Sequence, residues 1–348
     1  MWRIALWLVV PALAATGCSD PGYALYAVSG QLALASRVRP LQDVMNDGSL
    51  SQEQVAKVQE ILQIRDFAAN ELHLNVGNNY TVYLDTGGAP IAYNLSASAK
   101  DSLTPLTWTF PFAGTIPYIG FFHEAEAKAY QGRLVDQGYD TVLYGVESYS
   151  TLGIFPDPIS TTMLTRSEAF LADLIIHELT HNTVWCDNNT EFNENAASFV
   201  GRVGGLLYLS RKYGADAPVV IQARQGYEDG DVYQSFLSDL YLRLHDFYAS
   251  DLSAEQKIAG RADIFADAQR RFAEEILPQM HDPASYEWVK PLELNNAWIL
   301  VNARYNRDLS AFQAVYDATG QDFGATLRIL LDAAASDDPV GYLRNPAP

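Results

Sequence analysis

The sequence changes character near residue 167, and this change limits the fold more than any other feature. Between residues 80 and 147, aromatic and β-branched runs alternate with turn residues, which is typical of short β-strands. After residue 167, almost every segment has apolar residues at helical spacing. Strands followed by helices predict an α+β fold, with a small antiparallel or mixed sheet and a mainly helical second half.

Spacing and turn signals place the individual elements. Two helices are predicted before the strands, at 23–44 and 51–72, and the second begins at a capping box, Ser51 to Gln54. Strands are predicted at 80–85, 91–95, 107–112, 118–122 and 141–147, with a helix at 124–137. The helices of the second half are predicted at 167–186, 190–213, 231–249, 253–276, 292–304 and 309–332. We expect a single domain over residues 18–348, with an α/β part at 18–160 and a helical part at 161–348.

The charge balance excludes several classes of protein. Asp and Glu number 42 against 23 Lys and Arg, so the net charge is −19. A chain this acidic is repelled by phosphate backbones, so we expect no nucleic-acid partner. It also lacks the basic surface of a peripheral membrane protein. Apolar residues make up 48% of the chain, which is typical of a globular protein and not of a disordered one.

The N-terminus has the features of a signal peptide over residues 1–17. A short apolar run, Ile4 to Ala15, is followed by Ala15-Thr16-Gly17-Cys18, which resembles a bacterial lipobox. Cys18 is therefore the expected lipidation site, and Ser19 favours the outer membrane, facing the periplasm. An ordinary secretory signal or a short membrane anchor is the alternative. If Cys18 is lipidated, Cys186 has no partner and a structural disulfide is excluded.

One motif indicates a metal-binding, catalytic site. His177-Glu178-Leu179-Thr180-His181 lies in an apolar, helical stretch. Residues four apart on a helix differ by about 40° in direction, so both imidazoles can bind one metal ion from the same face. Glu178 points elsewhere and can take a proton from a water beside the metal. We expect Zn²⁺, with His177 and His181 as ligands and Glu178 as the catalytic base. The alternative is a core helix with two incidental histidines.

A catalytic zinc site needs a third protein ligand, and three residues compete. Asp187 would require a helix break, usually at a glycine, where this chain has Val184. Glu194 lies in 192–197, which resembles the NExxA segment of the gluzincin metallopeptidases. Glu191 lies three residues earlier, on nearly the same helix face. We expect Glu194 to complete the site, with Glu191 and Asp187 as alternatives.

Together with these motifs, several segments resemble a bacterial family of putative aminopeptidases, which are zincin-type lipoproteins of the cell envelope. The matching stretches are Gly22–Gln31, Ile64–Ala68, Tyr149–Gly153, Asp157-Pro158, His177–His181, Phe192–Glu194 and Asn295–Ala297. The resemblance covers most of the chain after the signal peptide. It implies a zincin-like, gluzincin-type fold and a zinc peptidase acting on peptides or proteins. In that family the positions of His177, His181 and Glu194 bind zinc, and Glu178 is base and acid.

The sequence does not identify the substrate. The GxMEN stretch that binds a free amine in well-known zinc aminopeptidases is absent, so exopeptidase and endopeptidase action both remain possible. Glu147 or Glu124 could bind an amine, and His245 or Tyr305 could stabilise the oxyanion, although each is also explained as an ordinary structural residue.

We expect an extended substrate to pair with a sheet-edge strand. The strand at 141–147 is the first candidate and 91–95 the second. A non-catalytic zinc-binding envelope lipoprotein that binds a peptide or an assembly partner is the alternative function. Glu178 argues against it, because a structural zinc does not need that residue.

Overall fold

The structure is a computed structural model that describes residues 21–110, 114–146, 156–187, 189–304 and 308–345. The expected signal peptide, Cys18, and the stretch Tyr149–Gly153 lie outside the described residues. The chain forms two compact units, and each draws on three separate segments of the sequence. Unit 1 consists of Met1–Arg37, Ala89–Glu147 and Val232–Ala303, and unit 2 of Val38–Gly88, Ser148–Asp231 and Arg304–Pro348.

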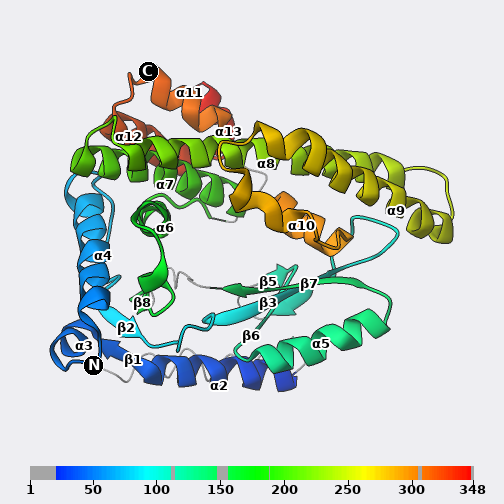
Figure 1. Cartoon of the computed structure of the whole chain (residues 1–348), viewed down its shortest axis with the longest axis horizontal. Helices are drawn as coiled ribbons and strands as arrows, with labels where there is room; N and C mark the ends of the chain where they lie inside the picture. Colours follow the sequence, from blue (N-terminus) through cyan, green and yellow to red (C-terminus); the bar gives the residue numbers. More distant parts are fainter. Residues whose placement is uncertain (1–20, 111–113, 147–155, 188, 305–307, 346–348) are drawn as a thin grey trace. The chain divides into compact units, whose positions relative to one another are not determined.

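Unit 1 is built on an antiparallel sheet with the strand order β6-β3-β7. Its strands are β6 (Ile119–Phe121), β3 (Ala92–Ser98) and β7 (Asp140–Val146), and β4 (Trp108–Phe110) pairs with β5 (Gly114–Ile116) beside them. Helices α2 (Pro21–Arg37) and α5 (Glu124–Asp136) lie along one face of the sheet (Figure 1). The hydroxyl of Tyr23, on α2, donates to the Gly120 oxygen at 2.6 Å, which fixes α2 to β6.

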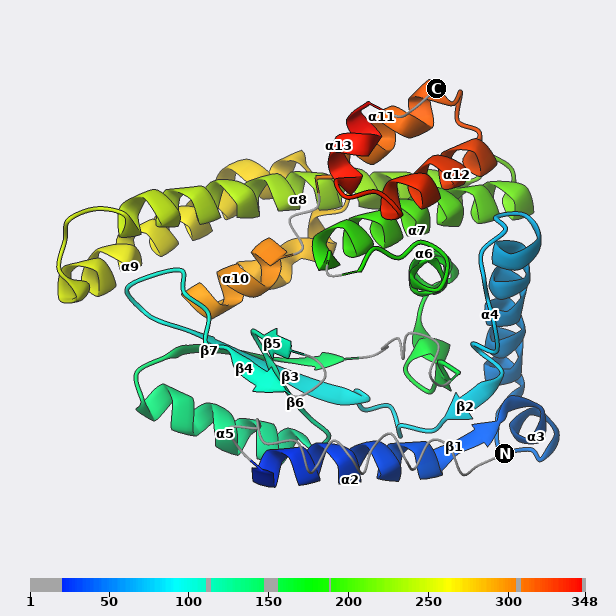
Figure 2. The same cartoon turned by 180° about the vertical axis from the view of Figure 1, so that it is seen from behind.

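Helices of the later sequence cover the other face of this sheet, as both views show (Figure 2). They are the part of α8 (Pro218–Tyr248) from Val232 onward, α9 (Ala254–Arg271) and α10 (Asn296–Arg304). A π-helical turn (Phe272–Ile276) and two 3-10 helices (Leu277–Gln279 and Pro283–Val289) connect α9 to α10. Neighbouring residues of β7 face opposite layers: Val142 packs with the α8–α10 cluster and Leu143 with the α5 cluster.

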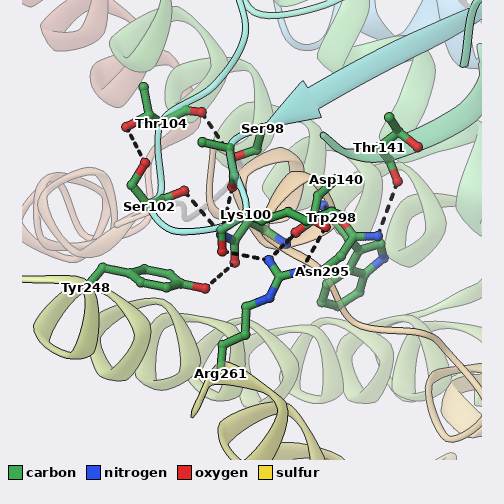
Figure 3. Close-up of polar contacts among 12 residues, drawn as sticks. Ser98, Lys100, Ser102, Thr104, Asp140, Thr141, Tyr248, Arg261, Asn295 and Trp298 are labelled. Carbon is green, nitrogen blue, oxygen red and sulfur yellow. Dashed lines mark hydrogen bonds and ion pairs between the residues drawn. The ribbon is translucent and has the colours of Figure 1, made fainter. Parts of the chain in front are cut away.

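A buried polar network ties the helices of unit 1 to its sheet (Figure 3). Arg261 of α9 makes a bidentate ion pair with Asp140 at the start of β7, with N–O distances of 2.5 and 3.0 Å, and also donates to the Lys100 oxygen. Asn296 is fully buried; its backbone N–H donates to Asp140, and its side-chain oxygen accepts from Tyr248. Its amide donates to three backbone oxygens of one loop, those of Ala99, Lys100 and Ser102.

Removing this amide should strongly destabilise unit 1. Asn296→Ala removes a donor to three loop oxygens and the acceptor of the buried Tyr248 hydroxyl, and leaving a buried polar group without its partner costs about 1–3 kcal/mol. We therefore expect a fall of about 3 kcal/mol in the free energy of unfolding, measured by urea titration. Asn302→Ala is the matched control on the same helix, because its amide donates to the Trp298 oxygen one turn earlier and not to the loop. Equal losses in the two variants would contradict the assigned role of Asn296.

Unit 2 combines a small mixed sheet with a set of helices, and two of these helices carry the candidate motifs. Its strand order is β1-β2-β8, with β1 (Val38–Pro40) antiparallel and β8 (Ile159–Ser160) parallel to β2 (Val82–Leu84). Its helices are α3 (Leu41–Asn46), α4 (Gln52–Asn70), α6 (Glu168–His181), α7 (Thr190–Tyr213), the first part of α8, α11 (Ser310–Ala318), α12 (Phe323–Ala334) and α13 (Pro339–Arg344), with a 3-10 helix at Met163–Thr165. One apolar core joins these elements.

The expected α+β class with a mainly helical second half is confirmed. Local signals were accurate: both halves of the capping box at Ser51 are formed, and α7 has the predicted bounds. The helix predicted at 23–44 is wrong as a single element, because β1 interrupts it at Val38–Pro40, where proline removes a backbone donor. The helix predicted at 309–332 divides at Gly320 and Gln321, which both have positive φ.

Candidate metal centre

Helix α6 presents the two histidines of the motif. Ser167 caps its start by accepting from the Phe170 N–H at 3.3 Å. Leu171, Ile175 and Leu179 are fully buried and fix which face of α6 meets the core of unit 2. The histidines lie at the margin of this buried face, and their rings meet edge to face with centroids 5.1 Å apart.

Helix α7 approaches α6 closely enough to bring a carboxylate to these rings. Gly201 lies on the side of α7 that touches α6. A β-carbon at this position would lie 2.8 Å from a carboxylate oxygen of Asp173 and 3.1 Å from the β-carbon of His177. A larger residue would therefore push the helices apart. The absence of a side chain at 201 keeps α7 at the distance that places Glu194 opposite the histidines.

The turn between α6 and α7 is held by one buried side chain. The Asn193 oxygen accepts from the Cys186 N–H at 2.8 Å, and the Asn193 amide donates to the Cys186 oxygen at 2.9 Å. Asn189 caps α7 by accepting from the Phe192 N–H. These bonds hold the start of α7 to Cys186, between the motif and Glu194. This role of Asn193 was not predicted from the sequence.

Three side chains converge at the site. The Nε2 atoms of His177 and His181 each lie 3.7 Å from an oxygen of Glu194, and the three ligand atoms lie within 4.8 Å of one another. Tetrahedral zinc with bonds of about 2.0–2.1 Å separates its ligand atoms by about 3.4 Å, so this donor set fits zinc after a small closure. Among the described residues, neither Asp187 nor Glu191 belongs to this group. The Asp187 carboxylate instead accepts from the Trp185 indole at 3.1 Å.

Glu178 has an unusual electrostatic environment. Burial, together with the nearby charges of Asp157 and Glu194, raises the pKa of its carboxyl group to about 8. A carboxyl group with a pKa near neutrality is suited to accept and return a proton at physiological pH. Perturbed groups of this kind are concentrated at functional sites.

Asp157 is part of this environment, and no motif in the sequence gave it a role. It is buried and exchanges two hydrogen bonds with Asn79: its carboxylate accepts from the Asn79 amide at 2.8 Å, and its N–H donates to the Asn79 oxygen at 3.1 Å. Arg65 donates to the Asn79 backbone oxygen. Tyr80, with a positive φ of 62°, donates its N–H to the Asp157 oxygen. The one indication of this network in the sequence is that Arg65 and Asp157 lie in stretches that match the resembled family.

The raised pKa of Glu178 gives the metal-free protein a specific pH dependence. The folded protein holds this proton up to about pH 8, whereas an unfolded glutamate releases it near 4.5. Stability should therefore fall as the pH rises through this window, by at most about 1.4 kcal/mol per pH unit from this group. Glu178→Gln should remove this pH dependence of the free energy of unfolding. In urea unfolding, the variant should therefore become more stable relative to the wild type as the pH rises from 5 to 8. If the stability of the two proteins changed with pH in parallel, the raised pKa assigned to this carboxyl group would be contradicted.

The remaining expected residues are placed as follows. His245 and Glu124 belong to unit 1, where His245 is exposed beside Asp246 and Glu124 pairs with Lys128. Tyr305 and Glu147 lie outside the described residues.

The second candidate for substrate pairing, the strand at 91–95, is wrong. In the structure β3 pairs with β6 on one side and with β7 on the other, so it offers no free edge. Pairing of a substrate with β7 stays a prediction.

Comparison with known proteins identifies a family for the chain. A protein-family model described as "Putative aminopeptidase" matches residues 22–336. No curated protein and no solved structure matches the chain significantly. The matched region includes both helices of the candidate metal centre and segments of both units. Because the match covers most of the sequence, the protein belongs to the putative aminopeptidase family.

Proposed function

We propose that the protein is a zinc-dependent peptidase that hydrolyses peptide bonds in the bacterial cell envelope. The observation that carries this proposal is the convergence of His177, His181 and Glu194 beside a partly buried glutamate, Glu178, with a raised pKa. Two imidazoles and one carboxylate form a common ligand set of catalytic zinc sites. Membership of the aminopeptidase family supports peptide hydrolysis as the reaction.

The roles of the residues follow from their chemistry. A bound zinc would polarise the scissile carbonyl and make water a better nucleophile near neutral pH. Glu178 takes a proton from the attacking water and passes it to the leaving amine. The close packing at Gly201 and the Asn193 hydrogen bonds hold Glu194 against the histidines, so the donor set is arranged in advance.

The arrangement also supports a zincin-like fold of the gluzincin type. The motif helix α6 packs against a second helix, α7, that supplies the acidic ligand twelve residues after His181. A residue four positions beyond that glutamate often supports a histidine in the gluzincins. It is Ser198 here, and its hydroxyl donates to the Glu194 backbone oxygen instead.

The proposed location is the outer membrane, facing the periplasm, through a lipid on Cys18. The lipobox-like sequence at residues 15–18 supports this assignment. Within the part of the chain that the structure describes, no helix combines the length and apolar character needed to cross a membrane. Labelling of the full chain with a fatty-acid analogue, compared with Cys18→Ser, tests the anchor.

Peptide cleavage tests the proposed activity. The zinc-loaded protein should cleave members of a peptide library, a chelator should abolish cleavage, and added zinc should restore it. Parallel libraries with free and acetylated N-termini decide between aminopeptidase and endopeptidase action. Zinc binding without any cleavage would contradict the peptidase assignment and favour a non-catalytic zinc-binding lipoprotein.

A further inference from the structure

Trp185 is a large aromatic residue beside the candidate metal centre, yet much of it is in contact with solvent. Its relative exposure is 44%, whereas its neighbours Val184 and Cys186 are buried. It lies one turn after His181, and the two rings meet edge to face with centroids 6.2 Å apart. The turn between α6 and α7 thus holds an apolar surface next to a ligand side chain.

The position of this ring is fixed. The Trp185 indole N–H donates to the Asp187 carboxylate at 3.1 Å, which restricts rotation of the side chain. The backbone of the next residue is held by both hydrogen bonds from Asn193. A ring that is held in place while exposed loses little conformational entropy when a ligand covers it, and this favours binding.

The groups assigned to the chemistry are polar. The ligand set and Glu178 supply imidazoles and carboxylates, which can orient a peptide bond but cannot distinguish one apolar side chain from another. The Trp185 and His181 ring centroids are 6.2 Å apart and consecutive α-carbons in a peptide are about 3.8 Å apart, so a side chain flanking a bond held at the centre can extend to the Trp185 ring. Aromatic surfaces of this kind bind apolar side chains through burial of area.

We propose that Trp185 forms one wall of a substrate subsite that binds a bulky apolar or aromatic side chain flanking the scissile bond. This inference rests on the proposed peptidase function and names its substrate class. A ring that only shields His181 would affect zinc binding and all substrates equally. A subsite wall changes the preference among substrates and leaves zinc binding unchanged.

The test compares peptides with Leu or Phe against Gly or Ala at each of the two positions flanking the cleaved bond. For Trp185→Ala, kcat/KM should fall about tenfold for Leu or Phe at one of these positions and less than twofold for Gly or Ala. Trp185→Phe should retain the preference. Zinc content should be the same in all variants. Trp288→Ala, at the other exposed tryptophan of the described residues, is the control and should leave the preference unchanged.

A binding measurement separates this inference from the catalytic proposal. In zinc-loaded Glu178→Gln, calorimetry with the same peptides should give a Kd about tenfold weaker after Trp185→Ala, again only for the bulky apolar side chains. A preference that survives Trp185→Ala, or that Trp288→Ala changes equally, would overturn the subsite. Cleavage without a preference for bulky apolar residues would overturn the subsite and leave the peptidase assignment intact. Absence of any cleavage or peptide binding by the wild type would overturn both.

Discussion

Glu178→Gln should lower kcat by about 10³-fold while zinc stays bound. Glutamine has nearly the same volume as glutamate, so the packing of α6 is kept, but its amide cannot accept the proton of the attacking water. General base catalysis contributes about 10²–10⁴-fold in enzymes, which sets the expected size of the effect. KM should change little, because Glu178 acts on the water and not on the bound peptide. Initial rates on a cleaved library peptide measure the effect.

The control for this variant is Glu191→Gln, an exposed glutamate on the first turn of α7. Its rate should stay within about twofold of the wild type, since Glu191 lies outside the group of converging ligands. If Glu178→Gln kept more than a tenth of the wild-type kcat, Glu178 could not be the catalytic base.

Glu194→Ala should weaken zinc binding by more than 100-fold. The carboxylate lies 3.7 Å from both histidine Nε2 atoms, so its removal leaves two ligands where a catalytic zinc site uses three. Loss of a residue that only supports a ligand costs about 10–100-fold, and loss of a ligand should cost more. Competition with a chromogenic chelator measures the affinity.

The same experiment decides among the three carboxylates that the sequence left open. Glu191→Ala and Asp187→Ala should bind zinc within about threefold of the wild type, because neither carboxylate belongs to the ligand group among the described residues. A large loss in either of these variants, with Glu194→Ala unaffected, would move the third ligand to that residue and contradict the geometry of α7.

The features that could be predicted from the sequence are those with local causes. The two histidines share a face of α6 because four residues make about one helical turn. The start of α4 follows from the reciprocal hydrogen bonds of Ser51 and Gln54. The bounds of α7 follow from the Asn189 cap and from Gly214, whose positive φ ends the helix.

The features that could not be predicted depend on contacts between distant segments. Asn79 and Asp157 are 78 residues apart, and nothing in their local sequence indicates that they pair. The division into two interleaved units has the same cause, because each unit joins three separate stretches. The first 13 residues of α8 (218–230) were missed because Gly226 and Gly230 lower its helix propensity, whereas burial of Val220 in the core of unit 2 stabilises it there.

The most direct test of the central claim is the zinc content of the protein after reconstitution and removal of free metal. We expect about one zinc per chain in the wild type, and almost none in His177→Ala. Absence of bound zinc in the folded wild type, or equal zinc in the variant, would contradict a metal centre built from His177, His181 and Glu194.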